Sequence, residues 1–257
     1  MIKWAMTASK SRNVLNEAER AFGEAHQIPI LLRQNKSIPY LLEHYELDVL
    51  LVMENGELAA YSPGNRLVYH PGMAAPRLKQ WRQGVEETLM TALALAPGQR
   101  MLDGTMGLAS DALVASAMVG ESGQVICLEK SPIIYIVTTY GLAHCTKGSL
   151  ELQAAMRRIE TRLGDYHEVL PGLADKSFDV VYLDPMFIHP VESSTGIAGL
   201  RQAADHYQPT AEDLAQARRV AAKRVVVKHG KGQMAQVAFD EVIGGRYSSI
   251  GYGIFYG

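Results

Sequence analysis

The central and C-terminal parts of the chain alternate short hydrophobic runs with helical segments, and this alternation constrains the fold more than any other feature. The runs are rich in Val, Ile and Leu, as buried strands are. Strands that alternate with helices predict a parallel sheet covered by helices on both faces. We expect strands over 100–103, 124–129, 159–164, 178–184 and 224–229, helices over 111–119, 132–142 and 211–222, and a terminal antiparallel hairpin over 241–243 and 250–256.

The first 75 residues follow a different pattern, which predicts a small α+β appendage. Asn55-Gly56 lies between two hydrophobic runs and is the sequence signal of a type I′ hairpin turn. Apolar residues at helical spacing predict amphipathic helices elsewhere. In this appendage we expect helices over 11–26 and 39–45 and strands over 48–53, 58–61 and 67–69. The second domain, residues 76–257, is expected to begin with a helix over 77–95.

Composition indicates an ordinary globular protein of the reducing cytoplasm. The 257 residues are 47% hydrophobic and 20% charged, and no apolar run reaches the roughly 18 residues that a membrane span requires. Cys127 and Cys145 show neither CxxC spacing nor histidine clustering, which argues against a structural zinc site. We therefore expect a cytoplasmic protein that binds no membrane and no metal.

The net charge of −2 gives no support to a nucleic-acid partner. Locally, residues 214–239 contain no Asp or Glu but hold six Lys and Arg side chains. This stretch is either a solvated helix face with charged strand ends or a surface that faces RNA.

The turn after the first predicted strand, Asp103-Gly104-Thr105-Met106-Gly107, carries the first chemical signal. An acid, two glycines and a new helix at the edge of a parallel sheet predict a site for a nucleoside-bearing cofactor. That cofactor is either S-adenosylmethionine or a dinucleotide, although the spacing fits the dinucleotide fingerprint G-x-G-x-x-G poorly. A plain tight turn would explain the glycines but not the acid beside them.

Two further acids follow the next two strands. Glu129 ends the second strand, where a carboxylate can accept both ribose hydroxyls of an adenosyl group. Asp165 follows the third, where it can accept a hydrogen bond from the adenine amine. The alternative for each is an ordinary solvated strand-end or turn residue.

The sharpest signal is Asp184-Pro185-Met186-Phe187, which a buried strand delivers to the same sheet edge. The lone pair of an exocyclic base amine is delocalised into the ring, so the amine is a poor nucleophile. A carboxylate and a neighbouring carbonyl that accept its two hydrogens would localise the lone pair, and Phe187 would stack on an extruded base. The alternative is an Asp-Pro turn with Phe187 in the core.

These residues together resemble class I S-adenosylmethionine-dependent methyltransferases. The runs Leu183–Phe187 and Arg224–Lys228 are most similar to the ribosomal small subunit methyltransferase J group, which methylates guanine N2 in rRNA. His70–Arg77 and Gly107–Asp111 resemble an uncharacterised bacterial relative of that group, and the resemblance covers roughly residues 70–257. It implies an α/β fold with a Rossmann-like seven-stranded methyltransferase sheet, the last strand antiparallel.

The resemblance also implies roles for the site residues. Asp103, Gly104 and Gly107, with Thr105 in the same turn, would bind the methionine part of S-adenosyl-L-methionine. Glu129 would bind the ribose, Asp165 the adenine, and Asp184, Pro185 and Phe187 the target amine and its base.

We therefore expect an S-adenosylmethionine-dependent methyltransferase of an exocyclic amine, with guanine N2 of rRNA as the leading acceptor and rRNA or the ribosomal subunit as the partner. Met186 stands where related enzymes often carry a second proline, and residues 188–195 lack the lysines typical of the rRNA enzymes. Three alternatives stay open: a small-molecule or protein acceptor, a non-catalytic nucleoside- or RNA-binding module, and a dinucleotide oxidoreductase.

Overall fold

The computed structural model describes residues 2–185, 208–230, 234, 236–244 and 249–257. Contacts between residues divide the chain into two compact units. The smaller comprises residues up to His70 together with Ile136–Cys145, and the larger comprises Pro71–Tyr135 and the described residues from Thr146 onward. The boundary after residue 75 that the sequence suggests stays a prediction.

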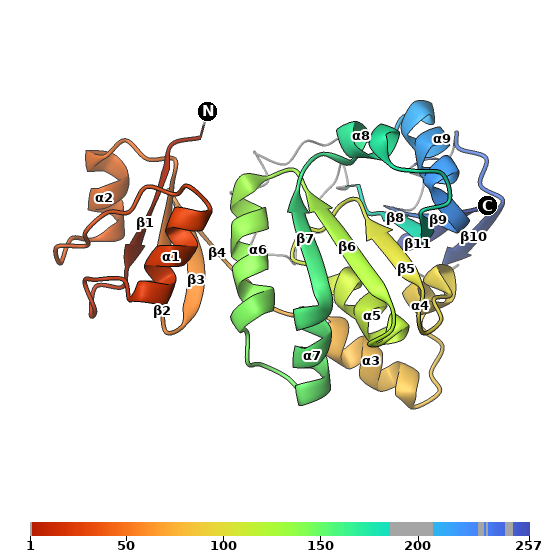
Figure 1. Ribbon diagram of the computed structural model, residues 1–257, viewed down its shortest axis with the longest axis horizontal. Coiled ribbons are helices and arrows are strands. Elements are labelled where there is room, and N and C mark those ends of the chain that lie inside the picture. Colours follow the sequence, from red (N-terminus) through yellow and green to blue (C-terminus); the bar gives the residue numbers. More distant parts are fainter. Residues whose placement is uncertain (1, 186–207, 231–233, 235, 245–248) are drawn as a thin grey trace. The chain divides into compact units, whose positions relative to one another are not determined.

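Seven strands of the described chain form the sheet of the larger unit, in the order β10-β11-β9-β8-β5-β6-β7 (Figure 1). The five strands β5 to β9 are parallel, and β11 runs antiparallel to β9 and to β10. The α/β class, the Rossmann-like sheet and the antiparallel last strand are thereby confirmed. The strands are β5 (Arg100–Asp103), β6 (Gln124–Glu129), β7 (Ile159–Leu163), β8 (Phe178–Leu183), β9 (Ala221–Gly230), β10 (Glu241–Gly244) and β11 (Ile250–Tyr256).

Helices cover both faces of this sheet. Helix α9 packs on β8 and β9, while α4 and α5 pack on the other face, with α3 and α7 against α5. The α9 face holds a hydrophobic cluster that includes Leu102, Val181 and Val225. The helices are α3 (Ala74–Arg82), α4 (Thr88–Leu93), α5 (Ser110–Val119), α7 (Leu150–Arg158), α8 (Tyr166–Val169), a 3-10 turn η1 (Leu170–Gly172) and α9 (Ala211–Val220), while α6 (Pro132–His144) has residues in both units.

The helix expected over 77–95 is wrong, because the structure divides this stretch into α3 and α4. Gly84 between them has a φ of +77°, a left-handed conformation that interrupts helical hydrogen bonding. The Glu87 side chain then accepts a hydrogen bond from Met90 N and caps the new helix. Trp81 and Val85, whose spacing of four residues would place them on one face of a continuous helix, are 43% and 51% exposed.

The smaller unit contains a four-stranded sheet in the order β1-β2-β3-β4. The predicted hairpin turn is confirmed, since Asn55 and Gly56 both have positive φ angles, 51° and 79°. The sequence did not predict β1, which pairs in parallel with β2, and α1 begins later than expected because Asn16 caps it. The elements are β1 (Trp4–Ala8), α1 (Glu17–Ala25), α2 (Ile38–His44), β2 (Val49–Glu54), β3 (Glu57–Ser62) and β4 (Asn65–Val68).

No helix in the described part of the chain combines the length and the apolar character that crossing a bilayer requires.

Candidate active site

Strand register brings several polar side chains to one face of the large sheet. Asp103 of β5 pairs with Tyr182 of β8, and Tyr182 pairs with Val226 of β9. Side chains alternate between faces along a strand, so residues two positions further on share the face. Asp184 and Lys228 are those residues, and the two meet at the carboxyl ends of β8 and β9.

Thr105 links the ends of β5 and β8. Its hydroxyl accepts a hydrogen bond from Asp184 N at 2.6 Å and donates to Asp103 Oδ1 at 3.3 Å. The Thr105 main-chain N–H donates to the same Asp103 oxygen at 2.9 Å. The turn predicted to bind the cofactor and the segment predicted to bind the amine are therefore joined by one side chain.

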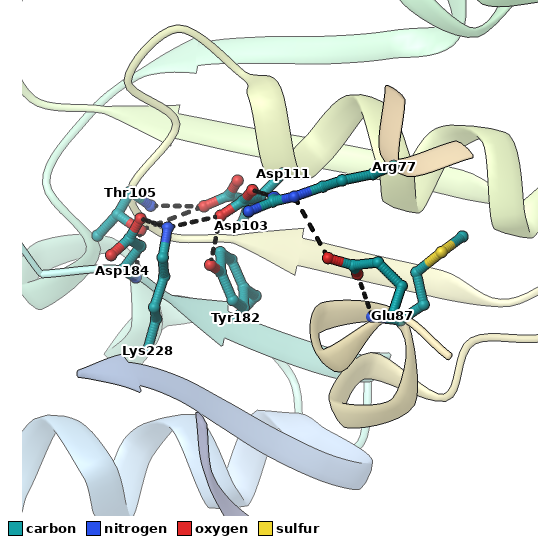
Figure 2. Close-up of polar contacts among 9 residues, drawn as sticks. Arg77, Glu87, Asp103, Thr105, Asp111, Tyr182, Asp184 and Lys228 are labelled. Atoms are coloured by element: carbon teal, nitrogen blue, oxygen red, sulfur yellow. Dashed lines mark hydrogen bonds and ion pairs between the residues drawn. The ribbon is translucent and has the colours of Figure 1, made fainter. Parts of the chain in front are cut away.

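A buried ion cluster surrounds Asp111, in the first turn of α5 (Figure 2). Lys228 Nζ lies 3.0 Å from Asp111 Oδ2, and the Tyr182 hydroxyl donates to the same oxygen at 2.7 Å. Arg77 Nη1 lies 2.5 Å from Asp111 Oδ1. Arg77 Nε also lies 3.3 Å from Glu87 Oε1, so the cluster ties α3 and the cap of α4 to α5, β8 and β9.

Lys228 joins this cluster to Asp184. Its ammonium group lies 2.7 Å from Asp184 Oδ2 as well as 3.0 Å from Asp111 Oδ2, and its side chain is only 12% exposed. The Asp184 side chain is 26% exposed, so it is more accessible than that of Lys228.

The cluster changes the charge preferences of its members. Burial opposes the ionisation of Asp111, but Lys228 and Arg77 outweigh it and lower the pKa of this carboxyl. Burial likewise disfavours charge on Lys228, but Asp184 and Asp111 raise its pKa. Asp111 and Lys228 are both charged at neutral pH.

Two other carboxyl groups at the same sheet edge have a raised pKa, in contrast to the lowered pKa of Asp111. Burial, with the charges of Asp111 and Asp184, raises the pKa of Asp103 to about 7. Burial also raises the pKa of Asp184 to about 6, against the lowering effect of Lys228. Asp103 therefore changes its charge near neutral pH, and perturbed acids of this kind concentrate at functional sites.

Glu129 is held by main-chain donors from two segments. Gly107 N donates to Oε2 at 2.9 Å and Ser131 N donates to Oε1 at 2.8 Å. Burial nevertheless raises the pKa of Glu129 against these hydrogen bonds. Each carboxylate oxygen has two lone pairs, so Glu129 keeps acceptor capacity for a further ligand while its orientation is fixed.

Asp165 lies at the start of α8. Its Oδ1 accepts a hydrogen bond from His167 N at 3.1 Å, and its Oδ2 lies 3.0 Å from Lys130 Nζ. Asp213 orients the His167 ring through a 2.6 Å contact at Nδ1. Asp165 is thus both a helix cap and an ion-pair partner beside the end of β7.

The two glycines of the β5–α5 turn serve different purposes. A Cβ at Gly104 would lie 2.6 Å from Leu183 Cδ2 and 3.1 Å from Tyr166 Cβ, so protein atoms fill that space. Gly107 has a φ of +53°, and a Cβ there would meet only Thr105 O at 4.0 Å. Open space lies over Gly107, whereas Gly104 permits close packing of the turn.

The polar groups at these strand ends fit a cofactor with an adenosyl group and a cationic amino-acid part. Asp103 offers a buried carboxyl group whose ionised form would pair with a cation, and Glu129 offers fixed acceptor oxygens at the next strand end. Helix α5 begins at Ser110 without a side-chain cap from Ala109, so its first N–H groups suit a carboxylate. These features lie along the carboxyl ends of β5 and β6, where open α/β sheets bind nucleosides.

The structure brings together most, but not all, of the residues that the sequence singled out. Asp103, Thr105 and Asp184 share one hydrogen-bonded chain, Gly107 contacts Glu129, and Pro185 follows Asp184 as a buried residue. Phe187 lies outside the described residues, so its stacking role stays a prediction. Sequence reasoning did not assign a role to the cluster residues Arg77, Glu87, Asp111, Tyr182 and Lys228.

The basic stretch around α9 and β9 serves the fold in large part. Arg219 contacts Asp175, and Lys223 lies 3.1 Å from Asp179. Lys228 belongs to the buried cluster. These contacts with protein acids weaken the interpretation of the stretch as a surface that faces RNA.

We predict that Asp103→Asn stabilises the cofactor-free protein increasingly as pH rises from 4 to 8. The folded protein holds a proton on Asp103 up to about pH 7, and the unfolded chain releases it near 3.8, so wild-type stability falls across this window. The Asn variant keeps an acceptor for Thr105 N but has no charge. Its advantage in the free energy of unfolding, measured with urea, should grow by up to about 4 kcal/mol. A difference that stays constant with pH would contradict this.

The sequence is similar to those of known methyltransferases. Residues 36–241 match the family model described as "Putative SAM-dependent methyltransferase". The chain is 40% identical to uncharacterized protein YpiP of Bacillus subtilis over 78% of both chains. It is 31% identical to ribosomal RNA small subunit methyltransferase J of Alkalilimnicola ehrlichii over 88% of both.

Among solved structures, a SAM-dependent methyltransferase from Neisseria gonorrhoeae shares the fold, with a TM-score of 0.68 and 20% identity over 98% of this chain and 95% of that one. The sequence resemblance is confirmed, and S-adenosyl-L-methionine is the cofactor. The chain belongs to the family of S-adenosylmethionine-dependent methyltransferases.

Proposed function

We propose that this methyltransferase modifies an exocyclic amine of a nucleobase in RNA, with guanine N2 of small-subunit rRNA as the leading acceptor. One observation carries the proposal: Asp184 places a fixed carboxylate, on a partly exposed side chain, at the end of β8 and next to the turn that follows β5. The relative from Alkalilimnicola ehrlichii, which is named for small-subunit rRNA, supports the choice of acceptor. The protein would meet this substrate, as rRNA or a ribosomal subunit, in the cytoplasm.

The cofactor would lie across the ends of β5, β6 and β7. The negative charge of Asp103 suits the amino-acid part, with Gly104, Thr105 and Gly107 shaping the turn around it. Glu129 would accept hydrogen bonds from the ribose hydroxyls, and Asp165 would accept one from the adenine amine. When bound, the cofactor supplies an electrophilic methyl group.

Asp184 would act on the target amine. Its carboxylate and a neighbouring main-chain carbonyl group, next to Pro185, would accept the two amine hydrogens. These hydrogen bonds would localise the nitrogen lone pair. Asp184 is ionised at neutral pH, since burial raises its pKa only to about 6, so it can accept the proton that the methylated nitrogen must lose. In-line placement of the amine would supply much of the remaining acceleration.

We predict that the purified protein transfers a labelled methyl group to small-subunit rRNA from cells that lack it. Digestion and mass spectrometry should identify N2-methylguanosine. Asp184→Ala should lower turnover by on the order of 10²-fold or more, because the acceptor is lost.

If the label is absent from rRNA and from intact small subunits but enters a small molecule or a protein, the rRNA assignment is wrong. If a folded, cofactor-binding wild-type protein labels none of these acceptors, a non-catalytic binding module is the better description.

Cofactor binding should separate the roles of Glu129 and Asp184. Glu129→Ala removes the acceptor of the ribose and of Gly107 N, so affinity for S-adenosylhomocysteine, measured by calorimetry, should fall about tenfold or more. Asp184→Ala should bind it as wild type does. Glu160→Ala, an exposed glutamate on β7, is the matched control. Equal loss in the Glu129 and Asp184 variants would contradict the two assignments.

A further inference from the structure

We infer that Lys228 is a positioning residue for methyl transfer: it fixes one carboxylate oxygen of Asp184 and so leaves the other as the acceptor for the target amine. The inference rests on the role proposed for Asp184. In this role Lys228, whose side chain is only 12% exposed, would act through Asp184 and would not contact the amine itself.

The geometry of the ion pair is the first support. Lys228 Nζ lies 2.7 Å from Asp184 Oδ2, a charge-assisted contact that restricts rotation of the carboxylate. Thr105 fixes the main chain of the same residue through Asp184 N at 2.6 Å. Among the described residues, no hydrogen bond engages Asp184 Oδ1. Both the backbone and one oxygen are thus held, and the second oxygen stays available.

The division of charge in the cluster is the second support. Asp111 has Arg77 at 2.5 Å and the Tyr182 hydroxyl at 2.7 Å, so it does not depend on Lys228 alone. Asp184 has Lys228 as its one cationic contact among the described residues. If Lys228 served only to neutralise Asp111, it would not need its contact with Asp184.

The groups around Asp184 show what the loss of Lys228 would do. Asp111 from α5 and Asp103 from β5 repel its charge, and the Tyr182 phenol lies on its own strand. Arg77 from α3 is a weaker counter-charge than Lys228. Without Lys228, the remaining acids and burial would favour a protonated Asp184, which has lost the charge that accepts a proton.

Carboxyl titration tests the inference without any methyl acceptor. Protein labelled with ¹³C at the aspartate carboxyls, saturated with S-adenosylhomocysteine, is titrated by NMR, and Asp184→Asn identifies the signal. In Lys228→Met the midpoint of Asp184 should rise by about one pH unit or more. Lys228→Arg should restore most of the wild-type midpoint. An unchanged midpoint in folded Lys228→Met overturns the inference.

Two controls protect this result. Lys223→Met removes a lysine from the same strand that pairs with Asp179, and it should leave the Asp184 midpoint unchanged. If circular dichroism shows that Lys228→Met does not fold, Lys228→Gln takes its place, since it keeps a donor but has no charge. The same shift is expected, and its absence has the same meaning.

The pH profile of methyl transfer to rRNA links the ion pair to turnover. The acid limb of kcat should move to higher pH in Lys228→Met by the shift seen in the titration, while KM for rRNA changes less than about threefold. If the titration shifts but wild type methylates no rRNA, the proposed acceptor is wrong and the ion-pair role stands. If wild type methylates rRNA and the acid limb does not move in Lys228→Met, the positioning role is wrong and the proposed function stands.

Discussion

The buried carboxylate of Asp111 is the contact on which the geometry of this site depends. It accepts from Arg77 on α3, Tyr182 on β8 and Lys228 on β9, and its own residue lies in the first turn of α5. A buried charge is costly unless it is paired, so the loss of any of these donors would destabilise the arrangement. The contacts drawn in Figure 2 therefore link two helices and two strands through one carboxylate.

Hydrogen bonds and an ion pair connect this cluster to the residues of the proposed site. Lys228 extends from it to Asp184, and Thr105 connects Asp184 to Asp103. The expected amine acceptor and the expected cofactor turn are thus parts of one network. Asp103 and Asp184 are buried near other acids, and both therefore have a raised pKa. Acids with such perturbed pKa values concentrate at functional sites.

The sequence predicts the sheet well because hydrophobic strands and acids at strand ends are local patterns. All five parallel strands, the terminal hairpin and the Asn55-Gly56 turn are confirmed. The long helix over 77–95 is wrong because a regular apolar spacing outweighed the single residue Gly84. Strand β1, which pairs in parallel with β2, was not predicted from the sequence.

The ion cluster could not be predicted in the same way. Arg77 and Lys228 are separated from Asp111 by 34 and 117 positions. Only the packing of α3 on α5 and the place of β9 beside β8 in the sheet bring them together. A signal was nevertheless present. The runs that carry the family resemblance, His70–Arg77, Gly107–Asp111 and Arg224–Lys228, each end in a member of the cluster.

The free energy of unfolding of Asp111→Asn tests most directly whether this carboxylate holds the site together. Asparagine keeps the shape but leaves Arg77 and Lys228 with one fewer negative partner. Urea denaturation of the cofactor-free protein should show a loss of about 3–5 kcal/mol. Asp179→Asn, which removes a partly exposed partner of Lys223, should lose about 1 kcal/mol or less. Equal losses in the two variants would contradict a central role for Asp111.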